Sequence, residues 1–148
     1  MINISRFREY LIERVAEVNA LSEHRIAHLF LGVREEHLVK KLRDSSGICL
    51  CVSYPDAEST GSDDCPRDTQ KSYLFLCAKV APGALDDEQE LLSYRDLQQV
   101  MLLLRNRLRD SSECININPE ESFRIEWEYQ IFGGFNGLSM SLTFNNYD

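Results

Sequence analysis

The sequence predicts an α+β fold: a mainly antiparallel sheet, two amphipathic helices packed on one face of that sheet, and a C-terminal β-hairpin. Residues 3–19 and 86–109 repeat apolar residues at helical spacing. Four shorter segments carry the alternating or continuous apolar pattern of strands, and a glycine-rich connection joins the last two. Because these strands come in groups before and after the long helix, we expect mostly antiparallel pairing.

The composition is that of a folded globular protein, with 43% hydrophobic and 27% charged residues in a chain of 148. A chain of this length can form one domain around one core, so we expect a single domain over residues 1–148. Lys and Arg total 16 against 24 for Asp and Glu, which gives a formal net charge of -8. This acidic balance argues against a general nucleic-acid binder, because such proteins need clustered basic residues.

The first predicted helix covers residues 3–19. Its apolar residues recur at steps of three and four and form one stripe: Ile4, Phe7, Leu11, Val15 and Val18. Charged residues occupy the opposite face, and Asn3 or Ser5 is placed to cap the start of the helix. The stripe therefore predicts which side of this helix faces the sheet.

Residues 23–33 leave two alternatives open, because the apolar spacing fits a short helix whereas residues 28–33 also fit a strand. A short helix is predicted next, over residues 35–43, with acidic residues first and basic residues last, as the helix dipole favours. A strand follows over residues 48–54 and ends at Pro55.

Residues 55–70 contain almost nothing apolar, and hold five acidic residues against Arg67 alone. Two prolines and one glycine interrupt the segment. We expect a long, mobile, acidic loop between two strands, and long loops in compact domains are often functional. Asp63 and Asp64 near its centre are therefore candidate interaction residues.

A buried strand is predicted over residues 73–80, because this segment is apolar on both faces except at Lys79. Pro82 and Gly83 then turn the chain into the longest helix, which begins at a cluster of acidic residues and ends near Arg109. The apolar stripe of this helix consists of Leu91, Tyr94, Leu97, Met101, Leu104 and Leu108.

The C-terminal third holds two alternating segments that predict an antiparallel hairpin with one buried and one solvated face. Their apolar residues are Phe123, Ile125, Trp127, Tyr129 and Ile131 in the first and Leu138, Met140, Leu142 and Phe144 in the second. Residues 132–137 read Phe-Gly-Gly-Phe-Asn-Gly, and the Asn-Gly pair is a typical turn signal. Phe132, Phe135 and Asn136 at the expected tip are further candidate contact residues.

Metal binding has two sets of candidates, and each has a simpler interpretation. His24 and His28 would share one face of a helix, but the Glu of the metalloprotease motif is missing and His37 lies elsewhere. The five cysteines are Cys49, Cys51, Cys65, Cys77 and Cys114. An odd number of thiols without a paired zinc-ligand motif favours reduced cysteines packed as small apolar residues. We therefore expect no metal and no other cofactor.

No nucleotide-binding loop, hydrolase nucleophile motif or calcium-binding loop occurs in the chain. The glycines at residues 133–137 precede a strand, whereas phosphate-binding loops precede the start of a helix. The carboxylates are explained by helix starts and solvated strand faces. The sequence thus identifies no catalytic constellation.

The order of elements resembles the small tail-terminator and tail-completion proteins of long-tailed phages. The segments that carry this resemblance are Ser5 to Val18, Ser72 to Val80, Glu88 to Leu108 and Ser122 to Phe144. That family forms rings by subunit contact and has no catalytic residues. The resemblance implies that the acidic segment and the tip at residues 133–137 contact neighbouring subunits or face the lumen of a ring.

We therefore expect a non-enzymatic structural or interaction protein, of phage or prophage origin, that assembles with itself or with another assembly subunit. Two alternatives remain: a small metal-dependent enzyme that uses His24, His28 and His37, and a regulatory module whose acidic loop binds a basic partner. Charges recur from the N-terminus onward, and no apolar run approaches the ~20 residues that span a bilayer. We expect a soluble protein without a membrane partner, located in the cytoplasm or incorporated in a virion.

Overall fold

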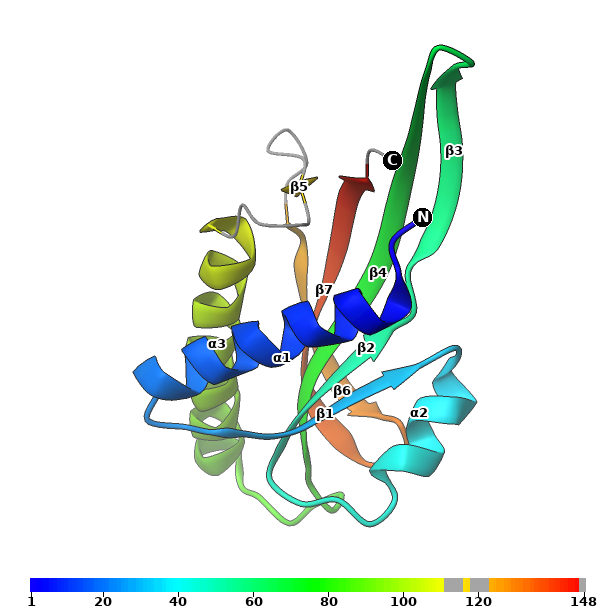
Figure 1. Ribbon diagram of the computed structural model, residues 1–148. Coiled ribbons are helices and arrows are strands. Elements are labelled where there is room, and N and C mark those ends of the chain that lie inside the picture. Colours follow the sequence, from blue (N-terminus) through cyan, green and yellow to red (C-terminus); the bar gives the residue numbers. More distant parts are fainter. Residues whose placement is uncertain (111–115, 118–122, 147–148) are drawn as a thin grey trace.

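The computed structural model describes residues 1–110, 116–117 and 123–146, and has an α+β fold (Figure 1). In chain order, its elements are α1 (Ile4–Leu21), β1 (Ile26–Gly32), α2 (Glu35–Leu42), β2 (Ile48–Ser53), β3 (Asp56–Ser62), β4 (Cys65–Lys79), α3 (Asp87–Asp110), β5 (Asn116–Ile117), β6 (Ile125–Ile131) and β7 (Phe135–Asn146). The predicted C-terminal hairpin is present as β6 and β7, which pair antiparallel.

The seven strands form one sheet in the order β1-β2-β4-β7-β5, with β3 paired to β4 and β6 paired to β7. Strands β4 and β7 form the centre of the sheet, in register from the pair of Asp68 and Asn146 to the pair of Lys79 and Phe135. In the part of the chain that the structure describes, β1 and β2 are the one parallel pair. The mainly antiparallel sheet predicted from the sequence is confirmed.

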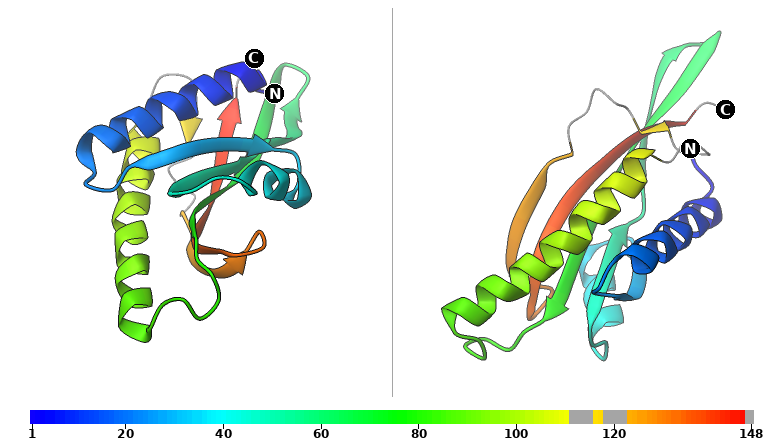
Figure 2. Two further views of the ribbon diagram at one scale, coloured as in Figure 1. Left: turned by 90° about the horizontal axis from the view of Figure 1, so that it is seen from below. Right: turned by 90° about the vertical axis from the view of Figure 1, so that its left-hand side faces the viewer.

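The sheet separates two apolar clusters, and β2 contributes to both because its side chains alternate between the faces. Leu50 and Val52 belong to the larger cluster, together with the buried faces of α1 and α3. Cys49 and Cys51 face the other way and pack in the smaller cluster, beneath α2. Figure 2 shows α1 and α3 on one side of the sheet, as the two amphipathic patterns predicted.

The ends of the two long helices are fixed by the residues that the sequence places there. The side chain of Asn3 accepts hydrogen bonds from the backbone N–H groups of Ser5 and Arg6, at 2.9 and 3.3 Å. Before α3, Asp86 accepts from the N–H of Gln89 at 2.8 Å, and the Gln89 side chain accepts from the N–H of Asp86 at 3.0 Å. This reciprocal pair is a capping box, and it satisfies two N–H groups that the first helical turn leaves without partners.

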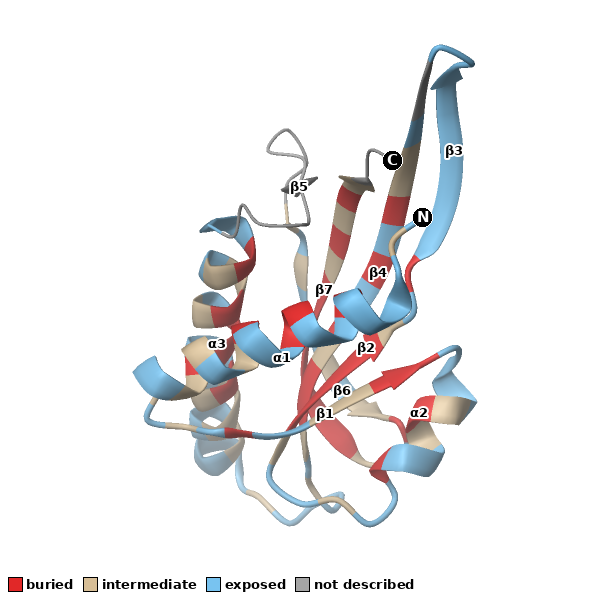
Figure 3. Cartoon of the chain, in the orientation of Figure 1, coloured by how far each residue is buried: buried red, intermediate tan, exposed pale blue. Residues whose placement is uncertain are grey.

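The expected acidic loop over residues 55–70 is instead a β-hairpin made of β3 and the first half of β4. All seven residues of β3 are exposed, and the hairpin projects beyond the rest of the sheet (Figure 3). The prediction of a loop was wrong because it depended on apolar residues, whereas this hairpin is held by backbone pairing that continues the β4–β7 ladder. Ser59 also donates to Asp68 at 2.6 Å across the two strands.

The ambiguous segment 23–33 forms β1 rather than a helix. Its register with β2 runs from the pair of Ile26 and Ile48 to the pair of Gly32 and Ser53, and α2 makes the crossover between the two parallel strands. The Asn19 side chain fixes the entry to β1, because it accepts from the N–H of Ile26 and donates to the Ile26 carbonyl, at 2.8 and 3.1 Å.

The turn of the β6–β7 hairpin lies three residues earlier than the Asn-Gly signal predicted. Gly133 and Gly134 make the turn with positive φ angles, whereas Asn136 and Gly137 lie inside β7. Asn136 is buried, and its side-chain oxygen accepts from the backbone N–H of Gln130 at 2.8 Å. Asn136 therefore ties β6 to β7 beside an irregular pair at Gln130, which itself has a positive φ of 51°.

Asn136→Ala is expected to lower the free energy of unfolding by about 1–3 kcal/mol, because the backbone N–H of Gln130 loses its acceptor. Self-association should not change. Urea unfolding measures the free energy of unfolding, and light scattering measures self-association. Asn145→Ala is the control, because this half-buried residue accepts a single side-chain bond, from Thr69 at 3.0 Å. If Asn136→Ala left the stability unchanged but altered self-association, Asn136 would be a contact residue, as the sequence predicted.

Candidate functional site

The contact residues predicted from the sequence do not form one surface. Asp63 and Asp64 are exposed in the turn of the β3–β4 hairpin. Phe132 and Phe135 are buried in the smaller apolar cluster, where the Phe132 ring meets Phe75 edge-on at 5.1 Å. The prediction that Phe132, Phe135 and Asn136 supply exposed contact surface was wrong, because the turn folds its aromatic residues back onto the sheet.

The three histidines lie apart. His24 is 3.5 Å from the carboxylate of Asp96. His28 stacks on Phe30 within β1, at 5.6 Å between ring centroids, and the His37 ring accepts from the backbone N–H of Val33. Among the described residues, no group of three or more His, Cys, Asp or Glu side chains could hold a metal ion.

Three cysteines are buried beneath α2, which confirms their predicted packing as small apolar residues. Cys49 and Cys77 are opposite each other in the β2–β4 ladder, and Cys51 lies on the same face. The hydrogen bond with Cys51, together with burial, raises the pKa of the Cys77 thiol, and burial raises the pKa of Cys49. A raised pKa favours the protonated thiol, which is the weaker nucleophile. Cys114 lies outside the described residues.

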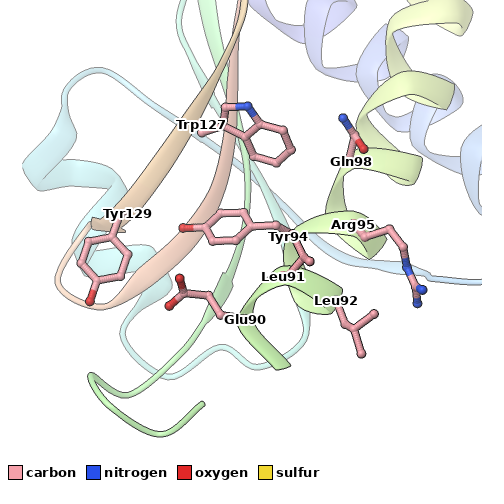
Figure 4. Close-up of a pocket in the computed structure, with 8 residues that line it drawn as sticks. All are labelled: Glu90, Leu91, Leu92, Tyr94, Arg95, Gln98, Trp127 and Tyr129. Atoms are coloured by element: carbon pink, nitrogen blue, oxygen red, sulfur yellow. The ribbon is translucent and has the colours of Figure 1, made fainter. Parts of the chain in front are cut away.

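An open groove with a volume of about 780 Å³ lies between the first half of α3 and strand β6. We call it the aromatic groove, and its lining residues are Glu90, Leu91, Leu92, Tyr94, Arg95, Gln98, Trp127 and Tyr129 (Figure 4). The side chains of Leu91, Trp127 and Tyr129 are 68%, 57% and 64% exposed, which is unusual for large apolar residues so close together.

Tyr94 holds the two walls of the groove together. Its ring meets the ring of Trp127 edge-on, with centroids 5.6 Å apart and planes at 81°. Its hydroxyl donates to the backbone carbonyl of Glu128 at 2.8 Å, which connects α3 to β6. Burial raises the pKa of Tyr94, and the nearby Glu90 carboxylate adds to the effect, so the phenol stays a neutral donor. The groove is therefore a fixed feature of the fold.

The charged residues that line the aromatic groove are Glu90 and Arg95. Figure 4 shows the Glu90 carboxylate turned toward Tyr94 and Tyr129, while Arg95 points away from them. Arg95 is bound to its neighbour Asp96, at 3.1 Å. Glu90 makes no ion pair with any described residue. An apolar aromatic floor with a free carboxylate at its rim suits a partner surface that combines apolar side chains with a cation.

The sequence contained a signal for this groove that the predictions did not use. Trp127 pairs with Leu138, and Ile125 with Met140, so the apolar face of β6 continues the face of β7 that packs under the helices. Leu91 and Tyr94 begin the apolar stripe of α3, whose buried residues start at Leu97. The apolar pattern thus identified the correct face of the sheet, but α1 and α3 do not cover that face as far as β6.

No helix within the described ranges is both long enough and apolar enough to cross a membrane. In comparisons with known proteins, no protein-family model matches the chain and no curated protein is significantly similar to it.

Proposed function

We propose that this chain is a non-enzymatic structural protein that works by self-association, as a component of a phage or prophage tail or of virion assembly. The observation that carries the proposal is the aromatic groove, where large apolar side chains stand exposed on a fixed scaffold. Aromatic residues that are exposed in a monomer are typical of the central part of protein–protein interfaces. The order of elements adds the resemblance to ring-forming tail proteins.

Edges of the sheet are also available for contact. In the described part of the chain, β1 pairs with β2 alone, β3 with β4 alone and β6 with β7 alone. Open edges present unpaired backbone groups, which natural monomers usually shield. The exposed polar side chains of β3 keep that edge soluble, so the aromatic groove is the surface with the stronger apolar drive to associate.

The test is the molar mass of the purified full chain, measured by light scattering over a range of concentrations. The proposal expects the mass to rise to a defined multiple of 17.1 kDa, and negative-stain images to show closed particles. A chain that remains monomeric at millimolar concentration, with no closed particles, would contradict it.

The regulatory-module alternative has one observation in its favour, the exposed acidic hairpin of β3 and β4. A variant in which an Asn-Gly turn replaces residues 59–68 separates the two functions. Under our proposal, this variant keeps the oligomeric mass of the natural chain. Under the alternative, it stays folded but no longer binds a cationic peptide that the natural chain binds.

A further inference from the structure

A second exposed surface lies on the outer face of α1. Ile4, Arg8 and Ile12 follow one another at intervals of four residues, and all three are exposed, with Ile4 and Ile12 at 41% and 42%. Residues four apart share one face of a helix, so the three side chains form a short stripe, apolar at both ends and basic in the middle. We call this surface the α1 stripe.

A shallow cavity of about 280 Å³ extends the α1 stripe toward β1 and α2. It is lined by Ile4, Ser5, Arg8, Leu29, Phe30, Leu31, Lys41 and Tyr54. Lys41 adds a second cation there, and donates to the backbone carbonyl of Leu31. The guanidinium of Arg8 makes no ion pair or hydrogen bond with the described residues, although Glu9 and Glu13 are close in sequence and Glu13 pairs with Arg14.

The α1 stripe and the aromatic groove are complementary in charge and in apolar character. The stripe presents Arg8 between two isoleucines, and the groove presents Glu90 beside Trp127 and Tyr129. Neither charge has an ion-pair partner among the described residues. A guanidinium over an aromatic face gains cation–π attraction, which increases when the contact excludes water. The α1 stripe therefore supplies a cation, and the aromatic groove supplies a carboxylate and exposed aromatic rings.

The two surfaces cannot meet within one copy. The right-hand view of Figure 2 shows α3 between α1 and β6. Contact between the α1 stripe of one molecule and the groove of another is therefore head-to-tail, and leaves a free groove and a free stripe at the two ends. Such contacts continue from copy to copy and form a ring if the rotation closes.

We propose that the aromatic groove binds the α1 stripe of a second copy of this chain, with Arg8 of one copy placed over Trp127 and Tyr129 and paired with Glu90 of the next. This inference rests on the proposed function and identifies the surfaces that would carry it. It also explains why Ile4, Leu91 and Trp127, all members of apolar patterns, remain uncovered in the single chain.

The test uses two full-length variants that each damage one surface, Arg8→Glu and Trp127→Ala. Each variant alone should be monomeric, with the association constant lowered at least about tenfold, as expected for loss of a central contact. An equimolar mixture should form a one-to-one heterodimer and nothing larger, because each variant keeps the surface that the other lacks. The charge-exchange variant Arg8→Glu, Glu90→Arg should recover association in part, because the ion pair returns whereas the cation–π contact does not.

Arg43→Glu and Tyr73→Ala are the matched controls, because both residues are exposed and lie outside the two surfaces. Both controls should associate as the natural chain does, and thermal melting should show every variant folded.

If the natural chain associates and Arg8→Glu and Trp127→Ala associate equally well, the inference is wrong and the proposed function stands. The inference would also be wrong if Arg8→Glu and Trp127→Ala were each monomeric and formed no heterodimer when mixed. The contact would then not join the α1 stripe of one copy to the aromatic groove of another. A natural chain that never associates would defeat the proposed function itself.

Discussion

Gly137→Ala is expected to lower the free energy of unfolding by at least about 3 kcal/mol, because β4 and β7 leave no room for a methyl group. A Cβ atom at residue 137 would lie 1.9 Å from the carbonyl oxygen of Leu76 and 2.7 Å from the Cα of Cys77. Both are backbone atoms in the central ladder, so no side-chain rotation can relieve the clash. The two strands must separate or shift their register.

Urea unfolding measures this loss, and Gly133→Ala is the matched control in the same hairpin. A Cβ at Gly133 would meet nothing within 4 Å, so its cost comes only from the φ angle of +79°, about 1–2 kcal/mol. A loss at Gly137 no greater than the loss at Gly133 would mean that β4 and β7 do not approach as closely as the structure shows.

The sequence predicted the parts of the fold whose apolar residues repeat with a clear period. The stripe of α1 gave Phe7 and Leu11 as core residues, and both are fully buried. The alternation in β2 separated its cysteines from Leu50 and Val52, and the two sets lie in different clusters. In each case these residues lie on a face that packs against the core, so the period alone identifies them as buried.

The β3–β4 hairpin could not be predicted in this way. Its residues are mostly polar, and β3 pairs with residues 65–71 of β4. The same strand continues past residue 72 into the apolar centre of the sheet, where it pairs with β7. Backbone pairing leaves no periodic pattern in the side chains of β3, because all of them are exposed. The turn between β6 and β7 was predicted at the wrong residues for a related reason. The Gly-Gly and Asn-Gly pairs both fit a turn, and the burial of Asn136 decides between them.

The candidate site was missed because the prediction assumed that every apolar stripe residue is buried. Leu91 and Trp127 satisfy the patterns of α3 and β6, yet both are exposed. The extent of a helix over a sheet depends on crossing geometry, which a single sequence does not specify. A wide sheet covered by only two helices on one face was nevertheless a reason to expect an uncovered edge.

Phe144→Ala and Tyr129→Ala, on the two strands of the C-terminal hairpin, are expected to differ by several kcal/mol in their effect on stability. Phe144 is fully buried and stacks on Phe7, with ring centroids 5.8 Å apart and planes at 17°. Its loss should cost about 3–5 kcal/mol and leave a cavity between β7 and α1. Tyr129 is mostly exposed in the aromatic groove, so its loss should cost no more than about 1 kcal/mol.

A double-mutant cycle of Phe7 and Phe144 gives the stacking contribution separately, with an expected coupling of about 0.5–1.5 kcal/mol. Light scattering on the same proteins completes the comparison, because Tyr129→Ala should weaken self-association while its folded core stays intact. If Tyr129→Ala instead destabilised the chain as much as Phe144→Ala, the ring of Tyr129 would belong to the core. The groove would then be a poorly packed part of the fold, and its aromatic residues would no longer argue for a partner.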